Sequence, residues 1–413
     1  MRKLLKVAIV SCAAAAVVGG LTLDRHGVVQ QRVASADDPV VPTCASLPDP
    51  IYVAGSSAVR PVLQSLGKSL ALASTPSTIV YVAANGSCDG VNSIVTGLKV
   101  TAGPKYVDNS GALLDCTLPS GGQAIDVGMS DVFPTSCPDV TADLLTGIGD
   151  FAGPVQSMNI VVPKAATQTT ISAEAAYLTF GLGAQGKTDW DNPDLYAIRN
   201  FQSGTETMTA KAINVPTNKW QGKDKGGSGG VVTYISAPPG DPDKTIGILA
   251  SNEADTVANR MTIKRLAFQP YGEQCALYPD SSYASKDKFN VRNGLYQIWG
   301  PLHMLANVDA QGVPTNTKAK QLLDVLLGNT TVDGVDVISI EATNNTVPQC
   351  AMKVQRTSEL GTPKAYNPAG QCGCYFESIV LGTDSPPGCT ACTKAADCSS
   401  AAPACNNGFC EVK

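Results

Sequence analysis

The stretch Arg199-Asn200-Phe201-Gln202-Ser203-Gly204-Thr205 follows a strand-like run at residues 195–198 and precedes a segment that can form a helix, residues 207–213. Ser203-x-x-Glu206 has the pattern of a capping box, which marks the start of a helix. A helix N-terminus presents unpaired backbone N–H groups and a partial positive charge, and Arg199 adds a planar fork suited to an oxyanion. The stretch therefore predicts a binding site for a tetrahedral anion. The alternative is an ordinary capped helix beside a surface arginine.

The order of strand, glycine turn and following segment recurs earlier in the chain. Such units are residues 51–54 with Gly55-Ser56-Ser57, residues 79–83 with Gly86-Ser87, and residues 124–129 with Ser130-Asp131. After the first turn, Val62, Leu63, Leu66 and Leu70 fall on one helical face. Residues 99–123 are rich in glycine and polar side chains and are expected to form an inserted loop or hairpin. Strands that alternate with helices predict an α/β fold with mostly parallel sheets.

Composition excludes several classes of function. The chain has 413 residues, 43% hydrophobic and 16% charged, with a formal net charge of -5, so nothing indicates nucleic-acid binding. An acidic protein that binds an anion must use local dipoles rather than its overall field. The only histidines are His26 and His303, which excludes histidine-based metal clusters and most histidine-dependent catalysis.

The N-terminus predicts export. Arg2, Lys3 and Lys6 precede an apolar stretch at residues 7–21, and Ala34-Ser35-Ala36 is a small-x-small cleavage site. We expect a signal peptide at residues 1–36 and a periplasmic or secreted mature chain. The alternatives are an uncleaved membrane anchor and a lipoprotein modified at Cys12.

The cysteines point to an oxidising compartment. There are fourteen, and removal of Cys12 leaves an odd number, so one is free or pairs with another chain. We expect Cys116 to pair with Cys88 or Cys137. The tail at residues 386–413 places Cys389, Cys392, Cys398, Cys405 and Cys410 among few large apolar side chains. It predicts a disulfide-rich module, with Cys372 or Cys374 as the sixth partner, and a zinc knuckle as the alternative.

In combination, these turns resemble the phosphate-binding component of the bacterial high-affinity phosphate ABC transporter. The resemblance runs from about residue 49 to about residue 306, and Arg199-x3-Ser203-Gly204-Thr205 is its most specific piece. It implies a type II periplasmic-binding-protein fold, with lobe I at residues 45–158 and 297–375 and lobe II at residues 159–296. It also implies a monomer that binds inorganic phosphate, delivers it to ABC permease subunits, has no enzymatic activity and needs no cofactor or metal.

The resemblance implies these phosphate ligands: Ser57, Ala58 through its backbone N–H, Ser87, Asp131, Arg199, Ser203, Gly204 and Thr205. Asp131 would accept a hydrogen bond from the oxygen that stays protonated in phosphate near neutral pH and is not protonated in sulfate. Phe201 stands where the family has an acidic residue that pairs with the arginine. The alternatives are another oxyanion or a phosphorylated metabolite, an enzyme with Ser57 or Ser203 as nucleophile, and a surface interaction protein that uses its cysteine-rich tail.

Overall fold

The computed structural model describes residues 21–23, 29–31, 41–82 and 86–413. The chain divides into residues 1–42 and residues 43–413, and each unit is described by itself. In the first, β1 (Leu21–Leu23) pairs antiparallel with β2 (Val29–Gln31). The predicted cleavage site and Cys12 lie outside the described residues. Within the described part, no helix combines the length and apolar character that a membrane crossing requires.

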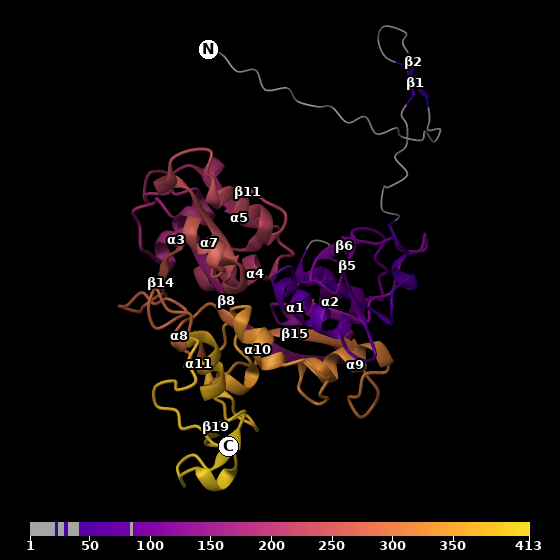
Figure 1. The fold of residues 1–413 in the computed structure, drawn as a ribbon. Coiled ribbons are helices and arrows are strands. Elements are labelled where there is room, and N and C mark those ends of the chain that lie inside the picture. The colour runs from indigo at the N-terminus through magenta and orange to yellow at the C-terminus, as the bar shows by residue number, and fades with distance from the viewer. Residues whose placement is uncertain (1–20, 24–28, 32–40, 83–85) are drawn as a thin grey trace, which may run out of the picture. The chain divides into compact units, whose positions relative to one another are not determined.

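Residues 43–413 are built on a sheet of eleven strands (Figure 1). Its strands follow the order β11 (Lys223–Asp224), β10 (Tyr196–Ile198), β12 (Ile246–Ala250), β8 (Ile148–Pro163), β15 (Trp299–Asn307), β7 (Val127–Ser130), β3 (Pro50–Gly55), β4 (Thr78–Val82), β5 (Pro104–Val107) and β6 (Leu113–Asp115), with β13 (Ile263–Arg265) also beside β8. We call the end from β7 to β6 with its helices lobe I, and the end from β12 to β11 with its helices lobe II.

The α/β two-lobed class is confirmed, but the sheet is mixed rather than mostly parallel. β3 pairs in parallel with β4 and β7, and β10 with β11 and β12. β8 and β15 run in opposite directions, pair antiparallel with each other and with β12 and β7, and join the two parallel halves, and β4 pairs antiparallel with β5. β8 pairs with β15 over residues 148–157 and then with β12 over residues 158–161. The insertion at residues 99–123 adds the antiparallel hairpin β5–β6, as expected.

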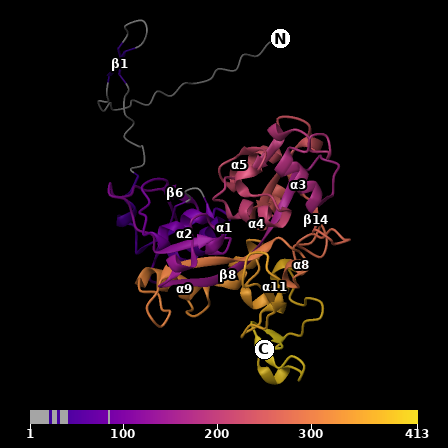
Figure 2. The same ribbon diagram turned by 180° about the vertical axis from the view of Figure 1, so that it is seen from behind.

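Helices from both ends of the sequence cover lobe I. α1 (Arg60–Ala71) buries the predicted face, Val62, Leu63, Leu66 and Leu70. α9 (Thr317–Leu326) buries side chains in the same apolar cluster. α10 (Val337–Thr343) contacts α1, which lies close to it in Figure 1, and α2 (Ser87–Val95) packs against β7; Figure 2 shows α1, α2 and α9 from behind.

Lobe II carries α3 (Ala173–Leu182), α4 (Gly204–Ile213), α5 (Ser228–Ser236), α6 (Ser251–Ala254) and α7 (Val257–Thr262), with β9 (Thr170–Ser172) parallel to β14 (Ala267–Gln269).

A buried ionic cluster fixes the segment that leads to α8 (Phe289–Arg292). Lys288 Nζ lies 2.8 Å from Asp255 Oδ2 and 2.9 Å from Asp280 Oδ1. Arg265 contacts the same two carboxylates, so each buried charge is paired.

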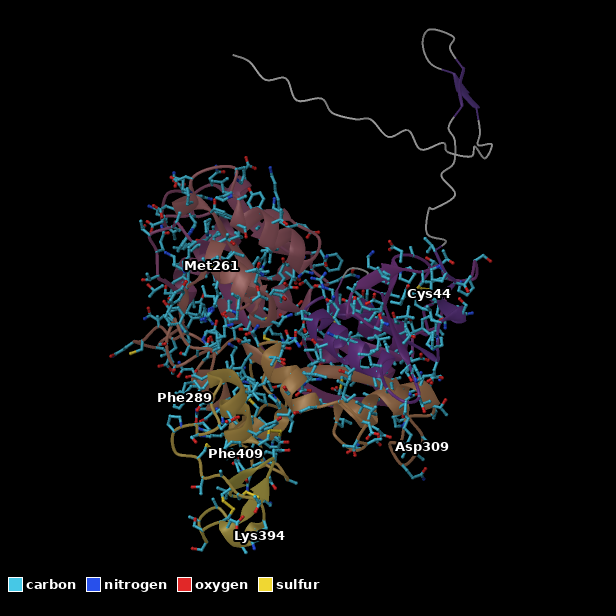
Figure 3. All side chains as sticks on the ribbon, in the orientation of Figure 1. Cys44, Met261, Phe289, Asp309, Lys394 and Phe409 are labelled. Carbon is cyan, nitrogen blue, oxygen red and sulfur yellow. A yellow bond between two sulfur atoms is a disulfide. The ribbon has the colours of Figure 1, made fainter. Side chains whose placement is uncertain are left out.

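The tail follows α11 (Gly373–Leu381) and contains the hairpin of β18 (Ala404–Asn406) and β19 (Phe409–Glu411). Before α11 in the chain, β16 (Val354–Gln355) pairs antiparallel with β17 (Lys364–Ala365). Figure 3 labels Lys394 and Phe409 in this tail. Its disulfides are Cys374–Cys389, Cys392–Cys405 and Cys398–Cys410. Cys374 therefore supplies the sixth cysteine, as predicted. The sulfurs of Cys392, Cys398 and Cys410 lie within 4.8 Å of one another, but all are in disulfides, which leaves no thiolate for zinc.

The predicted pairing of Cys116 was wrong. Cys116 pairs with Cys44, and Cys88 pairs with Cys137. The segment around Cys44 lies against the inserted segment at residues 99–123, because the Cys44 N–H donates to the Thr117 carbonyl at 2.9 Å. Cys350–Cys372 is a further disulfide, and among the described cysteines Cys275 is free and exposed.

Candidate functional site

On lobe I, the turn after β3 brings two serines toward lobe II. Gly55 has φ 125°, and a Cβ built on it would lie 2.1 Å from the Met129 carbonyl oxygen, so only glycine fits this turn. Ser56 Oγ donates to Asp131 Oδ2 at 2.6 Å. The Ala58 N–H donates to Ser56 Oγ at 3.0 Å. Ser57 Oγ lies 3.2 Å from Ser228 Oγ of lobe II.

Asp131 follows β7 and is 3% exposed. Its Oδ2 accepts from Ser56 and, at 3.3 Å, from Ser87 Oγ. Its Oδ1 is buried and has no hydrogen-bond partner in the structure. Burial raises the pKa of this carboxyl, and the hydroxyl donors and Arg199 oppose the shift. One carboxyl oxygen, Oδ2, therefore already accepts hydrogen bonds, and the other, Oδ1, is free to accept one from a ligand.

Arg199 directly follows β10 and is 4% exposed. Its Nε donates to the Gly226 carbonyl at 2.7 Å, its Nη1 to Ser228 Oγ at 3.2 Å, and its Nη2 to Ser57 Oγ at 3.5 Å. All these acceptors are neutral. Burial lowers its pKa, and Asp131, Asp224 and Glu206 oppose the shift from a greater distance. Phe201 is 49% exposed, so the glycine-rich turn before α5 orients the arginine in place of an acidic side chain at that position.

The start of α4 forms half of the predicted capping box. Ser203 Oγ accepts from the Glu206 N–H at 3.5 Å. The Glu206 carboxylate accepts from the Arg199 N–H at 3.0 Å, which diverts it from the Ser203 backbone. Glu206 is 1% exposed, and burial raises its pKa to about 8. Glu206 therefore ties the end of β10 to the first turn of α4.

The lobes touch where these turns face each other. The Cys88 N–H donates to the Gln202 carbonyl at 3.1 Å. A Cβ built on Gly204 would lie 2.4 Å from Ser87 Oγ and 2.9 Å from Asp131 Cβ. Arg60 Nη2 of lobe I lies 2.8 Å from Glu253 Oε1 of lobe II, beside this junction.

The structure thus gathers the predicted residues at one junction: Ser57, Ala58, Ser87 and Asp131 from lobe I, and Arg199, Ser203, Gly204 and Thr205 from lobe II. Sequence reasoning missed Ser56, which lies in the Gly55-Ser56-Ser57 turn that it identified, and Ser228, which begins α5. Spacing alone does not tell which of two adjacent serines faces Asp131.

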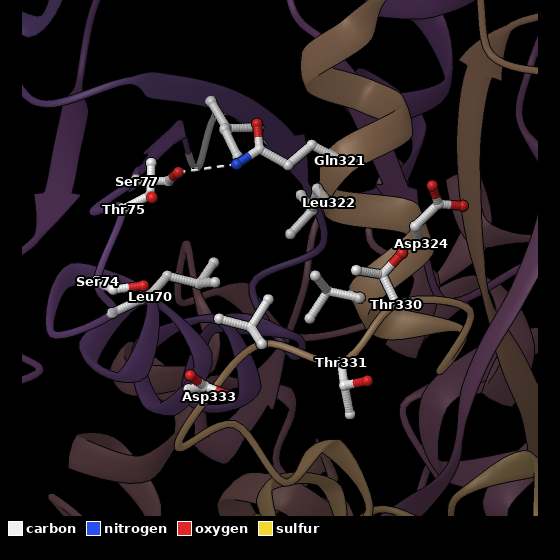
Figure 4. A pocket seen from close by; sticks show the side chains of 14 residues that line it. Leu70, Ser74, Thr75, Ser77, Gln321, Leu322, Asp324, Thr330, Thr331 and Asp333 are labelled. Atoms are coloured by element: carbon white, nitrogen blue, oxygen red, sulfur yellow. Dashed lines mark hydrogen bonds between the residues drawn. The ribbon is translucent and has the colours of Figure 1, made fainter.

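One cavity lies apart from this junction, whereas His303 of β15 lies beside Ser130 of β7. A cavity of about 380 Å³ lies between the ends of α1 and α9, where Gln321 Nε2 donates to Ser77 Oγ at 2.8 Å (Figure 4). None of the predicted site residues lines it. His303 Nδ1 lies 2.8 Å from Asp150 Oδ2, and the structure records no hydrogen bond between His303 and Ser57 or Ser203. A serine nucleophile activated by this histidine therefore has no support in the described residues.

No family model matches the chain, and no curated protein matches its sequence. Among solved structures it is similar to a provisionally assigned phosphate ABC transporter substrate-binding protein from Clostridium perfringens, solved with bound phosphate, at TM-score 0.50 and 13% identity over 73% of this chain and 99% of that one.

Two further solved structures are a phosphate transport receptor from Vibrio cholerae and a phosphate-binding protein from Stenotrophomonas maltophilia. The first has TM-score 0.44 and 13% identity over 72% of this chain and 99% of that one. The second has TM-score 0.43 and 12% identity over 72% and 90%. At such identities, the likeness to the Clostridium perfringens structure shows the fold alone: this chain has the two-lobed fold of a periplasmic binding protein.

Proposed function

We propose that this chain is a periplasmic or secreted phosphate-binding protein that holds inorganic phosphate between its lobes and delivers it to an ABC permease. The observation that carries the proposal is the buried pair of Arg199 and Asp131 on opposite sides of the junction. One has a full positive charge that rests on neutral acceptors, and the other has an unpaired oxygen. The predicted lobe boundaries at residues 158/159 and 296/297 are part of the proposal.

Arg199 supplies attraction in an acidic protein. Its three recorded side-chain hydrogen bonds go to a carbonyl and two hydroxyls, so no carboxylate in contact neutralises it. The first turns of α1, α2 and α4 add backbone N–H groups and hydroxyls on both sides of the junction. Such a set of local donors binds an anion without a positive overall field.

Asp131 supplies selectivity. Near neutral pH, phosphate still carries a proton and sulfate does not. Asp131 Oδ1 accepts a hydrogen bond from that protonated oxygen, whereas against sulfate it faces an unpaired like charge at a cost of several kcal/mol. The proposal therefore specifies a protonated tetrahedral oxyanion as the ligand.

Binding exchanges contacts within the junction for contacts with the ligand. Ser57 Oγ leaves Ser228 and Arg199, and the Ala58 N–H leaves Ser56 Oγ. The lobes part and close by bending of β8 and β15, the strands that pass between them. The Clostridium perfringens structure that is similar in fold is named as a substrate-binding protein, which agrees with a non-enzymatic role.

Calorimetric titration of the mature chain, freed of bound anion, tests the proposal at pH 7 with phosphate and then sulfate. We expect saturable phosphate binding and no sulfate binding. Arg199→Ala should weaken phosphate binding at least about tenfold. Loss of a hydrogen bond between charged groups costs about 1.5 kcal/mol or more, and about 1.4 kcal/mol is tenfold in affinity. Asp131→Asn should reduce the preference for phosphate over sulfate. The matched control is Asp143→Asn, which changes an exposed aspartate in lobe I. A folded chain that ignores phosphate would refute the proposal.

A further inference from the structure

A second cavity, of about 540 Å³, lies in the lobe I half of the molecule. Residues from the end of α9, from α10, from the start of β8 and from residues 348–350 and 366–370 line it. The walls are mostly apolar and include Leu326, Leu327, Val337, Ile338 and Pro348. The volume falls within the range of about 300–1,000 Å³ typical of small-molecule sites.

Glu341 of α10 lines this cavity and is 4% exposed. The structure records no hydrogen bond or ion pair for its carboxyl group; its backbone carbonyl accepts from Thr346. Buried carboxyl groups ordinarily have partners, because an unpaired one loses its hydration without compensation. A carboxyl left in this state at a cavity wall points to a ligand that donates to it.

The other lining groups narrow the chemistry of that ligand. No lysine, arginine or histidine lines the cavity. Gln349 donates through Nε2 to the Gly153 carbonyl at 2.7 Å, which leaves its oxygen as an acceptor. Tyr366 is the only other titratable lining side chain, since Cys350 is in a disulfide with Cys372. The cavity thus combines acceptors, one acid and apolar walls, which disfavours an anion.

We propose that this cavity binds a small organic amine, with its ammonium group on the Glu341 carboxylate and its apolar body against α9 and α10. The aromatic ring of Tyr366 and the oxygen of Gln349 are further partners for the cation. None of the predicted phosphate ligands lines the cavity, so the proposal stands independently of the proposed function.

The pH dependence of binding follows from the carboxyl. Burial, with no charged partner, raises the pKa of Glu341 to about 8. Below that pH the empty site is protonated, so an ammonium ion that binds the carboxylate releases a proton. Affinity should therefore rise with pH, about 50-fold between pH 6 and pH 8, while the amine itself stays charged up to about pH 10.

The experiment is calorimetric titration of the whole chain with n-butylammonium chloride at pH 6, 7 and 8, beside n-butanol and sodium butyrate. We expect saturable binding of the ammonium ion that strengthens with pH, with proton release measured in buffers of different ionisation enthalpy. Glu341→Gln should weaken this binding at least tenfold and abolish its pH dependence. The matched control is Glu174→Gln, which changes an exposed glutamate in lobe II.

Thermal unfolding at pH 5, where Glu341 is neutral, should show that the Glu341→Gln variant remains folded. Equal binding of butanol and butylammonium, or butylammonium binding that does not change with pH, would overturn the proposal. Absence of saturable butylammonium binding to the folded wild-type chain would overturn it too. None of these results bears on phosphate binding, which a phosphate titration of the same sample measures separately.

Discussion

At the scale of the residue, Gly204 determines how closely the two lobes approach. It begins α4, and its missing side chain leaves room for Ser87 Oγ and for Asp131 of the opposite lobe. The φ of Gly204 lies outside the left-handed region, so the requirement for glycine here comes from space rather than from backbone conformation. The glycine therefore matters for contact between the lobes and little for the helix that it begins.

Gly204→Ala tests this role. The added Cβ would lie 2.9 Å from Asp131 Cβ, which cannot rotate away, so the lobes must separate slightly. Overpacking of this kind costs about 1–3 kcal/mol, and we expect phosphate affinity to fall roughly 10–100-fold. Calorimetry measures the change. Gly229→Ala, in the first turn of α5, is the control, because nothing lies within 4 Å of its Cβ position. Equal affinities for the two variants would contradict the argument.

The residues of the junction show what a sequence can and cannot predict. Arg199 and Asp131 each follow a strand, as the sequence pattern predicted, and the family resemblance implied that they meet at one site. The partner of Arg199 depends on where the glycine-rich turn before α5 lies in space, and no local pattern states this. Likewise, Glu206 fits a capping box by spacing, yet its carboxylate bonds the backbone of Arg199, seven residues earlier.

At the scale of the element, α2 is fixed by a disulfide next to a candidate ligand. Cys88 follows Ser87 in the first turn of α2 and pairs with Cys137, which lies beyond Asp131 in the chain. The bond joins the turns that hold Ser87 and Asp131. Strand and helix positions here were predicted from periodicity, whereas the pairing was not, because cysteine spacing does not define connectivity.

Removal of this disulfide by Cys88→Ser with Cys137→Ser should destabilise the protein. The bond spans 49 residues, and the chain-entropy account assigns about 4 kcal/mol to a loop of that size. Urea unfolding followed by circular dichroism measures the loss, and phosphate affinity should fall as Ser87 loses its support. The control is Cys392→Ser with Cys405→Ser, which opens a loop of 13 residues within the tail. A main unfolding transition that moves equally in both variants would contradict a role specific to lobe I.

At the scale of the whole molecule, the tail attaches to one place on the two-lobed body. The Gln371 N–H donates to the Lys413 carbonyl at 2.9 Å, and the Cys374 N–H donates to Glu411 Oε1 at 2.7 Å. Asn406 Nδ2 donates to the Gln371 carbonyl at 3.0 Å. These contacts, with the Cys374–Cys389 disulfide, hold the tail to residues just before and within α11. A separate module and its covalent attachment through Cys372 or Cys374 were predictable from the sequence, but the hydrogen bonds from Gln371 to the last residues were not.

Deletion of residues 386–413, combined with Cys374→Ser to avoid a free thiol, should leave phosphate affinity unchanged within about twofold. The recorded tail contacts above fall on Gln371 and Cys374, and neither residue touches the junction between the lobes. Calorimetric titration with phosphate measures the affinity, and the full-length chain with Cys374→Ser is the control for the substitution. A loss of tenfold or more in the truncated chain alone would show that the tail supports lobe closure. The body and the tail would then be one energetic unit.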